Sequence, residues 1–128
     1  MRIERDFLGQ TEIPDNALFG IHSMRAKNNF QNDSLFDLEW YKALGITKQA
    51  VYLVYKKYKK AVLTKYPQIN IPIQFIDDEV LEALIAASGQ LAEGKHFEHF
   101  IVPAIQGGAG TSINLNVNEI IANCALNL

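Results

Sequence analysis

The residues best suited to chemistry in this sequence are three glycines and a Thr-Ser pair, in the run QGGAGTSINLNVNEI at residues 106–120. The glycines allow positive φ and let a ligand approach the backbone closely, because glycine has no Cβ. Thr111 and Ser112 follow at the predicted start of a helix, where N–H groups are unpaired and the helix dipole is positive. This arrangement favours the binding of a carboxylate or a phosphate.

Two nucleotide-binding motifs fail on this stretch. The dinucleotide fingerprint G-x-G-x-x-G is matched by Gly108 and Gly110 but has Ile113 at its third glycine position. A P-loop ends in G-K-[ST], whereas Gly110 is followed directly by Thr111, without a lysine. The alternative that stays open beside an anion site is a glycine turn with a Thr or Ser helix cap and no ligand.

The histidines are weaker candidates for a functional site. His96 and His99 lie three residues apart in HFEH, but no further ligand is suggested at a matching spacing. We therefore expect loop or surface histidines there, and no metal site. His22 and Arg25, in FGIHSMRAKNNF, form a potential anion-handling pair, although such a pair in an irregular segment favours a structural role.

Several polar residues near the C-terminal end are predicted to be buried. Asparagine is a poor residue in helix interiors, so a cluster of asparagines there indicates buried amide hydrogen bonds. The asparagines in question are Asn114, Asn116, Asn118 and Asn123. The single cysteine, Cys124, has no partner for an intrachain disulfide, which suits a reducing compartment, and we expect it to be a small buried apolar group.

An irregular arm and a long amphipathic helix are predicted for the first half of the chain. Residues 1–36 carry turn residues and no helical period, which predicts short strands and loops. From Asp37 to about Tyr66 the apolar residues keep helical spacing, and Pro67 ends the helix. The residues expected on its buried face are Leu44, Val51, Tyr55, Tyr58 and Val62. The following segment, YPQINIPIQF, is predicted to be a connector.

Two further helices complete a mainly α-helical fold with about three main helices. The first runs from Asp77 or Asp78 to the region of Gly94, and the next from about Ser112 to the end of the chain. The last helix has two apolar stripes, one of Ile113, Val117, Ile120, Ile121, Cys124 and Leu128, the other of Leu115, Ala122 and Leu126. Two apolar sides require two neighbours, which predicts oligomerisation or a further part of the chain.

Composition and charge indicate one ordinary folded domain. The chain has 128 residues, of which 48% are hydrophobic and 20% charged, and its net charge of −2 gives no reason to expect a nucleic-acid partner. The densest basic run favours a solvated helix face; its members are Lys56, Lys57, Lys59 and Lys60. We recognise no signal peptide and no apolar stretch of the roughly 20 residues that span a membrane, so a cytoplasmic location is expected.

Three motifs, in matching order, resemble the aspartase branch of the aspartase/fumarase superfamily. The run QGGAGTSINLNVNEIIANCAL is similar to its G-G-A-G-T-S-x-N-M-N-x-N-E-V-x-A-N; RIERDFLGQTEIP resembles R-I-E-x-D-x-L-G-x-x-x-I-P, and ALFGIHSMRAKNNF resembles Y-Y-G-I-H-T-x-R-A-x-x-N-F. Fumarases of this superfamily typically show T-G-S-G-T-x-S and G-x-Q-T-x-R-S instead, which favours the aspartase branch. The chain departs from the pattern at Ser23, Leu115, Cys124 and Asn127, where Thr, Met, Arg and Glu are usual.

The resemblance implies a reaction and a substrate site. The reaction is the reversible anti elimination of ammonia from L-aspartate to give fumarate, through a doubly charged aci-carboxylate and without a metal or an organic cofactor. The resemblance places Thr111, with the backbone of Ala109 and Gly110, at a substrate carboxylate. Ser112 and Asn114 are further candidates for contacts with the substrate. A fumarase, which hydrates fumarate to malate, and a non-catalytic module that binds a dicarboxylate or a protein partner are the alternatives.

The resemblance also implies parts of an enzyme that lie outside this chain. Family members are several times longer, assemble as homotetramers through a central helix bundle, and build each active site from three chains. Their S-[ST]-N-D and T-H segments and the G-S-S loop, which supplies a serine base, are expected downstream of Leu128. Residues 1–128 are therefore expected to be one N-terminal domain, helical over 37–128, without a general base and inactive alone.

Overall fold

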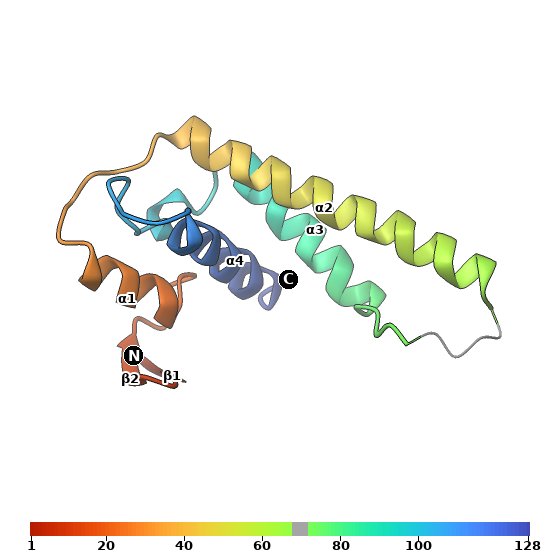
Figure 1. Ribbon diagram of the computed structural model, residues 1–128, viewed down its shortest axis with the longest axis horizontal. Coiled ribbons are helices and arrows are strands. Elements are labelled where there is room, and N and C mark those ends of the chain that lie inside the picture. The colour runs from red at the N-terminus through yellow and green to blue at the C-terminus, as the bar shows by residue number, and fades with distance from the viewer. Residues whose placement is uncertain (68–71) are drawn as a thin grey trace.

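The computed structural model describes residues 1–67 and 72–128, and its fold is mainly α-helical as predicted (Figure 1). The elements in chain order are β1 (Arg2–Asp6), β2 (Gly9–Ile13), α1 (Ile21–Asn29), α2 (Leu38–Lys65), α3 (Asp78–Ala92), the 3₁₀ turn η1 (Phe97–His99) and α4 (Thr111–Ala125). The three main predicted helices are thus present. Of the predicted connector at 66–75, residues 68–71 lie outside the described residues, and the remainder contains no helix or strand.

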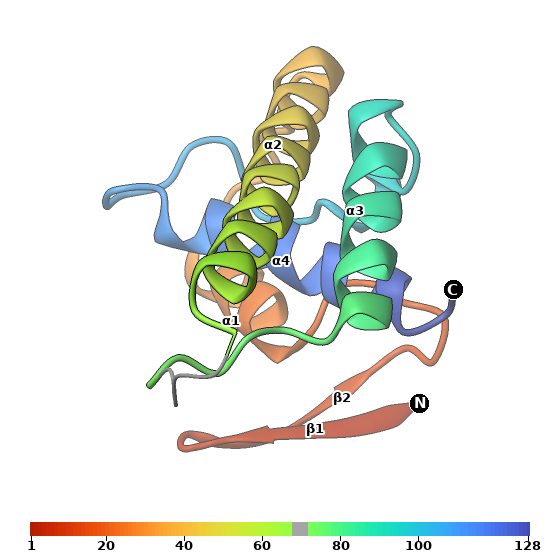
Figure 2. The same ribbon diagram turned by 90° about the vertical axis from the view of Figure 1, so that its right-hand side faces the viewer.

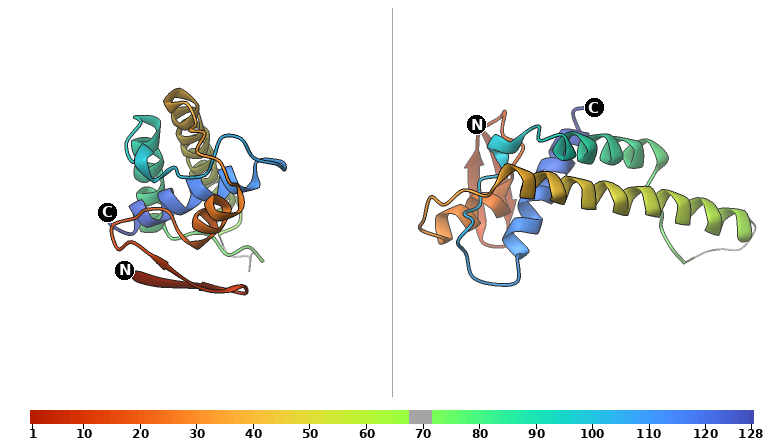
Figure 3. Two further views of the ribbon diagram at one scale, coloured as in Figure 1. Left: turned by 90° about the vertical axis from the view of Figure 1, so that its left-hand side faces the viewer. Right: turned by 90° about the horizontal axis from the view of Figure 1, so that it is seen from above.

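Helices α2 and α3 lie side by side and antiparallel, and α4 crosses below them (Figures 1 and 2). Seen from above, α2 extends well beyond the rest of the molecule (Figure 3). The core forms where α3, α4 and the first turns of α2 meet. Its buried members include Tyr41, Ala87, Leu91, Phe100, Val102, Val117, Ile120, Ile121 and Cys124. The predicted burial of Cys124 is therefore confirmed.

The buried face of α2 agrees only in part with the predicted one, in which Leu44, Tyr55 and Val62 are half-buried. Val51 and Tyr58 were expected to be buried, but they are 57% and 49% exposed. The buried positions of α2 are Tyr41 and Gly45 instead. The reason is that α2 carries apolar residues almost all round, so periodicity does not identify the face, whereas the missing side chain of Gly45 decides where α3 packs.

Helix α2 approaches the end of α3 very closely at Gly45. A Cβ added to Gly45 would lie 2.4 Å from the backbone nitrogen of Ala92 and 2.7 Å from the carbonyl carbon of Leu91. These are backbone atoms, so relief requires the two helices to move apart. The absence of a side chain at Gly45 is therefore a condition for this packing.

Gly45→Ala is expected to lower the free energy of unfolding by about 2–3 kcal/mol, because an overpacked contact forces the helices apart. The matched control is Gly89→Ala on the facing helix, where the new Cβ meets only the flexible end of Gln49 at 2.8 Å. Since alanine is also the better helix former, the control should be close to neutral. Urea unfolding followed by circular dichroism measures both variants. Equal stability of the two would contradict this account of the helix contact.

The N-terminal arm contains a helix that the sequence analysis did not predict. The expected strands are present as an antiparallel hairpin, β1 with β2, in which Arg2 pairs with Ile13 and Asp6 with Gly9. Residues 21–29, expected to be irregular, form α1. Local signals for this helix are missing, since Gly20 provides no side-chain cap and the first turn has no acidic residue.

Carboxylates from distant parts of the chain cap α1 in place of local residues. Glu119 of α4 accepts hydrogen bonds from the backbone N–H groups of Gly20 at 2.8 Å, His22 at 2.9 Å and Ser23 at 3.2 Å, and from the Ser23 hydroxyl. Glu4 of β1 accepts the N–H of Ile21 at 2.8 Å. Negative charge at a helix N-terminus is stabilising. The helix therefore depends on tertiary contacts that local sequence patterns do not contain.

Two sides of α4 were predicted to need neighbours, and other parts of this chain cover both sides in part. Its first apolar stripe packs in the core, where Val117, Ile120 and Ile121 are fully buried. On another side α4 contacts α1. Leu126 of the second stripe is 83% exposed, so an external neighbour is needed only near the end of α4. No helix in residues 1–67 or 72–128 is both long enough and apolar enough to cross a membrane.

Candidate carboxylate-binding site at the start of helix α4

The glycine run ends in a left-handed turn that leads directly into α4. The sequence analysis expected positive φ to be open to all three glycines, and Gly108 and Gly110 have φ of 96° and 80°. Gly107 does not have positive φ. Space around the turn is open, because a Cβ at Gly107 or Gly108 would meet no atom within 4 Å. A ligand therefore has access to the backbone of this turn.

The first turn of α4 offers its N–H groups without a cap from the protein. Its N-cap is Gly110, and no side chain accepts a hydrogen bond there. Thr111 begins the helix one residue earlier than expected, so neither Thr111 nor Ser112 is a cap. The alternative of a Thr or Ser cap is wrong for this reason. The orphan N–H groups and the dipole remain available to an anion.

Other helix starts in the described part of the chain are compensated by carboxylates. Asp37 accepts the N–H of Glu39 at the start of α2, and α3 has Asp78 and Glu79 in its first turn. The amides of α1 are capped by Glu119 and Glu4, as described above. The first turn of α4 contains no acidic residue. The positive end of α4 is therefore the one left for an external negative charge.

The residues predicted to contact a substrate, through the backbone in the case of Ala109 and Gly110, lie at the surface around this turn. Ala109 and Thr111 are exposed, while Gly110 and Ser112 are half-buried. Asn114, one turn further along α4, is also exposed and accepts a hydrogen bond from Lys48 Nζ at 2.6 Å. The five predicted residues are thus contiguous on one open end of α4.

Three side chains fix the position of the α4 start. Glu119 ties α4 to α1. Asn116, which is fully buried, accepts from the N–H groups of Ile101 at 2.8 Å and Val102 at 3.3 Å and donates to the carbonyl of His99 at 3.1 Å. Lys48 joins the first turn of α4 to α2, and burial lowers the pKa of this lysine. These contacts hold the turn in a defined place.

Of the four asparagines predicted to form buried amide hydrogen bonds, two bond to backbone groups inside the fold. Asn116 is described above, and Asn123 donates to the carbonyl of Leu18 at 2.8 Å. Asn114 bonds to Lys48 at the surface instead, and Asn118 is half-buried. Sequence reasoning missed Glu119 and Lys48. The only signal in the sequence was that each is a charged residue on a helix face whose other residues are mostly apolar or asparagine.

His22 and Arg25 lie on α1, beside the first half of α4. Arg25 donates to both carboxylate oxygens of Asp6, from Nε at 2.7 Å and from a terminal nitrogen at 2.8 Å. These hydrogen bonds hold the pKa of Asp6 below its usual value. Both motif residues line a cavity of about 570 Å³, which Ser112 and Leu115 also line. Because Asp6 already pairs with Arg25, this arginine links α1 to the hairpin.

Curated proteins match this chain in sequence over its whole length. No protein-family model matches it. Proteins named aspartate ammonia-lyase are 41% identical in a Bacillus species, 40% in Helicobacter pylori and 36% in Escherichia coli K12, over 98–100% of this chain. The chain spans about a quarter of the length of these curated relatives, 24% in each case.

Solved structures share the fold over nearly the whole chain. A fumarate lyase:delta crystallin from Brucella melitensis matches with a TM-score of 0.82 and 34% identity, over 99% of this chain and 26% of that one. A class II fumarase from Schistosoma mansoni matches with a TM-score of 0.78 over 97% of this chain and 23% of that one; at 23% identity it supports the fold alone. The chain belongs to the aspartase/fumarase superfamily, and it is similar over its full length to a part of the aspartate ammonia-lyases.

Proposed function

We propose that this chain supplies the carboxylate-binding part of a lyase that reversibly eliminates ammonia from L-aspartate to give fumarate. The observation that carries the proposal is the uncapped start of α4, where Thr111 follows the left-handed turn at Gly110. A substrate carboxylate fits the free N–H groups and the positive dipole of this turn. The Thr111 hydroxyl adds a directed donor, and Ala109 and Gly110 add backbone contacts. Ser112 and Asn114 are secondary contacts in this proposal.

The chemistry of the reaction explains why such a site has to bind charge strongly. Removal of the proton next to a carboxylate places a second negative charge on that group in the intermediate. Donors that are fixed in advance stabilise the charge as it develops, and so favour the transition state over the bound substrate. Because Asn116, Glu119 and Lys48 hold the α4 start in place, its donors need little rearrangement during the reaction.

The remaining parts of the enzyme are proposed to come from outside residues 1–128. The general base is one of them, so the chain alone is expected to be inactive. We further propose that residues 1–128 form one N-terminal domain of a cytoplasmic homotetramer, with His22 and Arg25 in structural roles. The length of the relatives supports the proposal of further parts outside this chain, since the chain spans 24% of the Bacillus relative.

Fumarate hydration is the less favoured activity. The relatives at 35–41% identity bear the name aspartate ammonia-lyase, whereas the fumarase match supports the fold alone. The decisive experiment expresses the complete reading frame that contains this chain. Its product is incubated with L-aspartate, and fumarate and ammonia are measured; fumarate is offered separately and malate is measured. Ammonia release from L-aspartate is the expected result, and malate formation without it would refute the proposal.

A further inference from the structure

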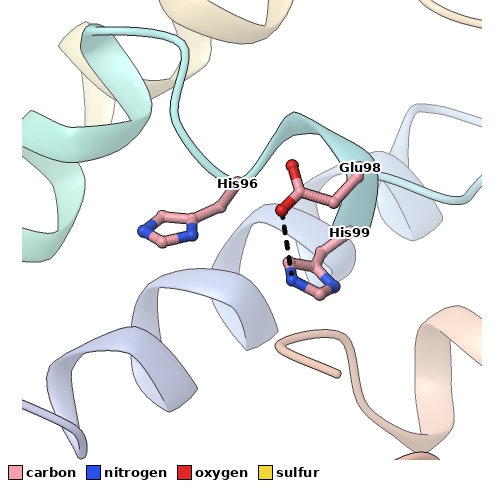
Figure 4. A group of neighbouring side chains, drawn as sticks. All are labelled: His96, Glu98 and His99. Carbon is pink, nitrogen blue, oxygen red and sulfur yellow. Dashed lines mark ion pairs between the residues drawn. The ribbon is translucent and has the colours of Figure 1, made fainter. Parts of the chain in front are cut away.

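The turn η1 brings together three side chains that can donate to a metal ion (Figure 4). His96, Glu98 and His99 each offer one donor atom, and these atoms all lie within 4.8 Å of one another. His99 Nε2 is 3.6 Å from a Glu98 carboxylate oxygen. The sequence analysis set the two histidines aside for want of a third ligand. That ligand is Glu98, which stands between them in HFEH.

We propose that His96, Glu98 and His99 bind a divalent transition metal ion such as Zn²⁺ or Co²⁺. Two imidazole nitrogens and one carboxylate oxygen are a ligand set that suits these ions, with water in the remaining position. The donor atoms must approach one another further to share one ion. Glu98 can do so readily, since its side chain is 71% exposed.

Gln90 of α3 prepares His96 for this role. The His96 Nε2 atom lies 2.7 Å from the side-chain oxygen of Gln90. An amide oxygen only accepts, so Nε2 carries the hydrogen and Nδ1 keeps its lone pair. In Figure 4 one ring nitrogen of His96 faces Glu98 and the other points away. Such an outer hydrogen bond is what fixes the tautomer and the orientation of metal-binding histidines.

The backbone at His96 also orients the ring. His96 has φ of 65°, and within residues 1–67 and 72–128 it is the one non-glycine residue with positive φ. This conformation costs free energy in a residue with a side chain, and such costs concentrate at functional sites. Here it turns the His96 side chain toward the face of η1 that carries Glu98.

Binding at His99 has an identifiable cost. Its Nδ1 accepts the N–H of Leu18 at a long distance of 3.4 Å. A metal ion at Nε2 moves the ring proton to Nδ1, so this contact has to open. The proposed site is therefore weaker than a fully prepared three-ligand site. It is separate from the carboxylate site at the α4 start, although Asn116 bonds to the carbonyl of His99.

The test is a titration of the protein with Co²⁺, followed by its visible absorption, with Zn²⁺ competition to confirm the site. One Co²⁺ per chain is expected, with the strong visible bands of a low-coordinate ion. His96→Asn keeps a residue that tolerates positive φ and should weaken binding by about 100-fold. Gln90→Leu removes only the outer hydrogen bond and should weaken binding by about 10-fold. The matched control is His22→Ala, which should bind as the unaltered protein does.

A second variant separates loss of binding from loss of folding. Glu98→Gln changes an exposed carboxylate to an amide of the same shape, so circular dichroism should be unchanged while Co²⁺ affinity falls. If Glu98→Gln and His96→Asn both retain the original affinity, the proposed ligand set is wrong. The same conclusion follows if His22→Ala alone abolishes the visible bands.

Discussion

Thr111→Val is expected to reduce kcat/KM for L-aspartate by about 10²–10³ in the protein that carries this chain, because one donor to the developing negative charge is lost. Valine keeps the β-branched shape of threonine and removes only the hydroxyl. Thr111 is exposed, and none of the described side chains caps this end of α4. The substitution should therefore leave folding intact. Initial rates of fumarate formation measure the effect.

Two further variants make this result specific. Thr111→Ser keeps a hydroxyl and should retain most of the activity. Thr64→Val removes an exposed threonine hydroxyl from α2, where Oγ1 donates to the carbonyl of Lys60 at 2.8 Å, and should leave kcat/KM unchanged. If Thr111→Val also has unchanged kcat/KM, Thr111 does not contact a charged group of the transition state, and the proposed substrate site at α4 fails.

Glu119→Gln should lower the free energy of unfolding by about 2–4 kcal/mol, since several donors lose a charged acceptor at once. The carboxylate accepts from three backbone N–H groups and one hydroxyl at the start of α1. The side-chain NH₂ group of glutamine is a donor, so it would face some of the N–H and O–H donors that now bond to the Glu119 carboxylate. Urea unfolding at a fixed protein concentration, followed by circular dichroism, measures the free energy of unfolding of the variant and of the unaltered protein.

Glu82→Gln is the matched control for this substitution. Glu82 forms an ion pair with Lys56 across α2 and α3, but both side chains are about half exposed, at 54% and 51%. Exposed pairs contribute little, so the control should change stability by less than about 1 kcal/mol. A similar small effect for Glu119→Gln would mean that α1 does not depend on this carboxylate.

Structural elements that are specified by residues close together in the chain could be predicted from the sequence. The starts of α2 and α3 follow from Asp37 and Asp77 at their N-caps, and the left-handed turn before α4 follows from Gly108 and Gly110. The buried amide of Asn116 was also predictable, because an asparagine inside an apolar helix needs partners. These features depend on one residue type at one position, which is what a sequence shows directly.

Features that depend on contacts between distant residues were not predictable. Helix α1 has no cap of its own and takes one from Glu119. The buried face of α2 is decided by the close approach of α3 at Gly45, while the apolar pattern around α2 points to several faces. The third member of the metal-binding group, Glu98, comes into reach of His96 only through the left-handed backbone and the 3₁₀ turn.

The Glu119 cap of α1 has a consequence for the order of folding. Its hydrogen bonds join residues that are 96 to 99 positions apart in the chain. Contacts of such sequence separation form slowly, because a long loop has to close first. During synthesis, residues 21–29 leave the ribosome long before Glu119 does, so the amides of Gly20, His22 and Ser23 lack their carboxylate acceptor at first. The helix that is made first is therefore among the last to become stable, and its amide hydrogens should acquire protection from exchange only after α4 has folded.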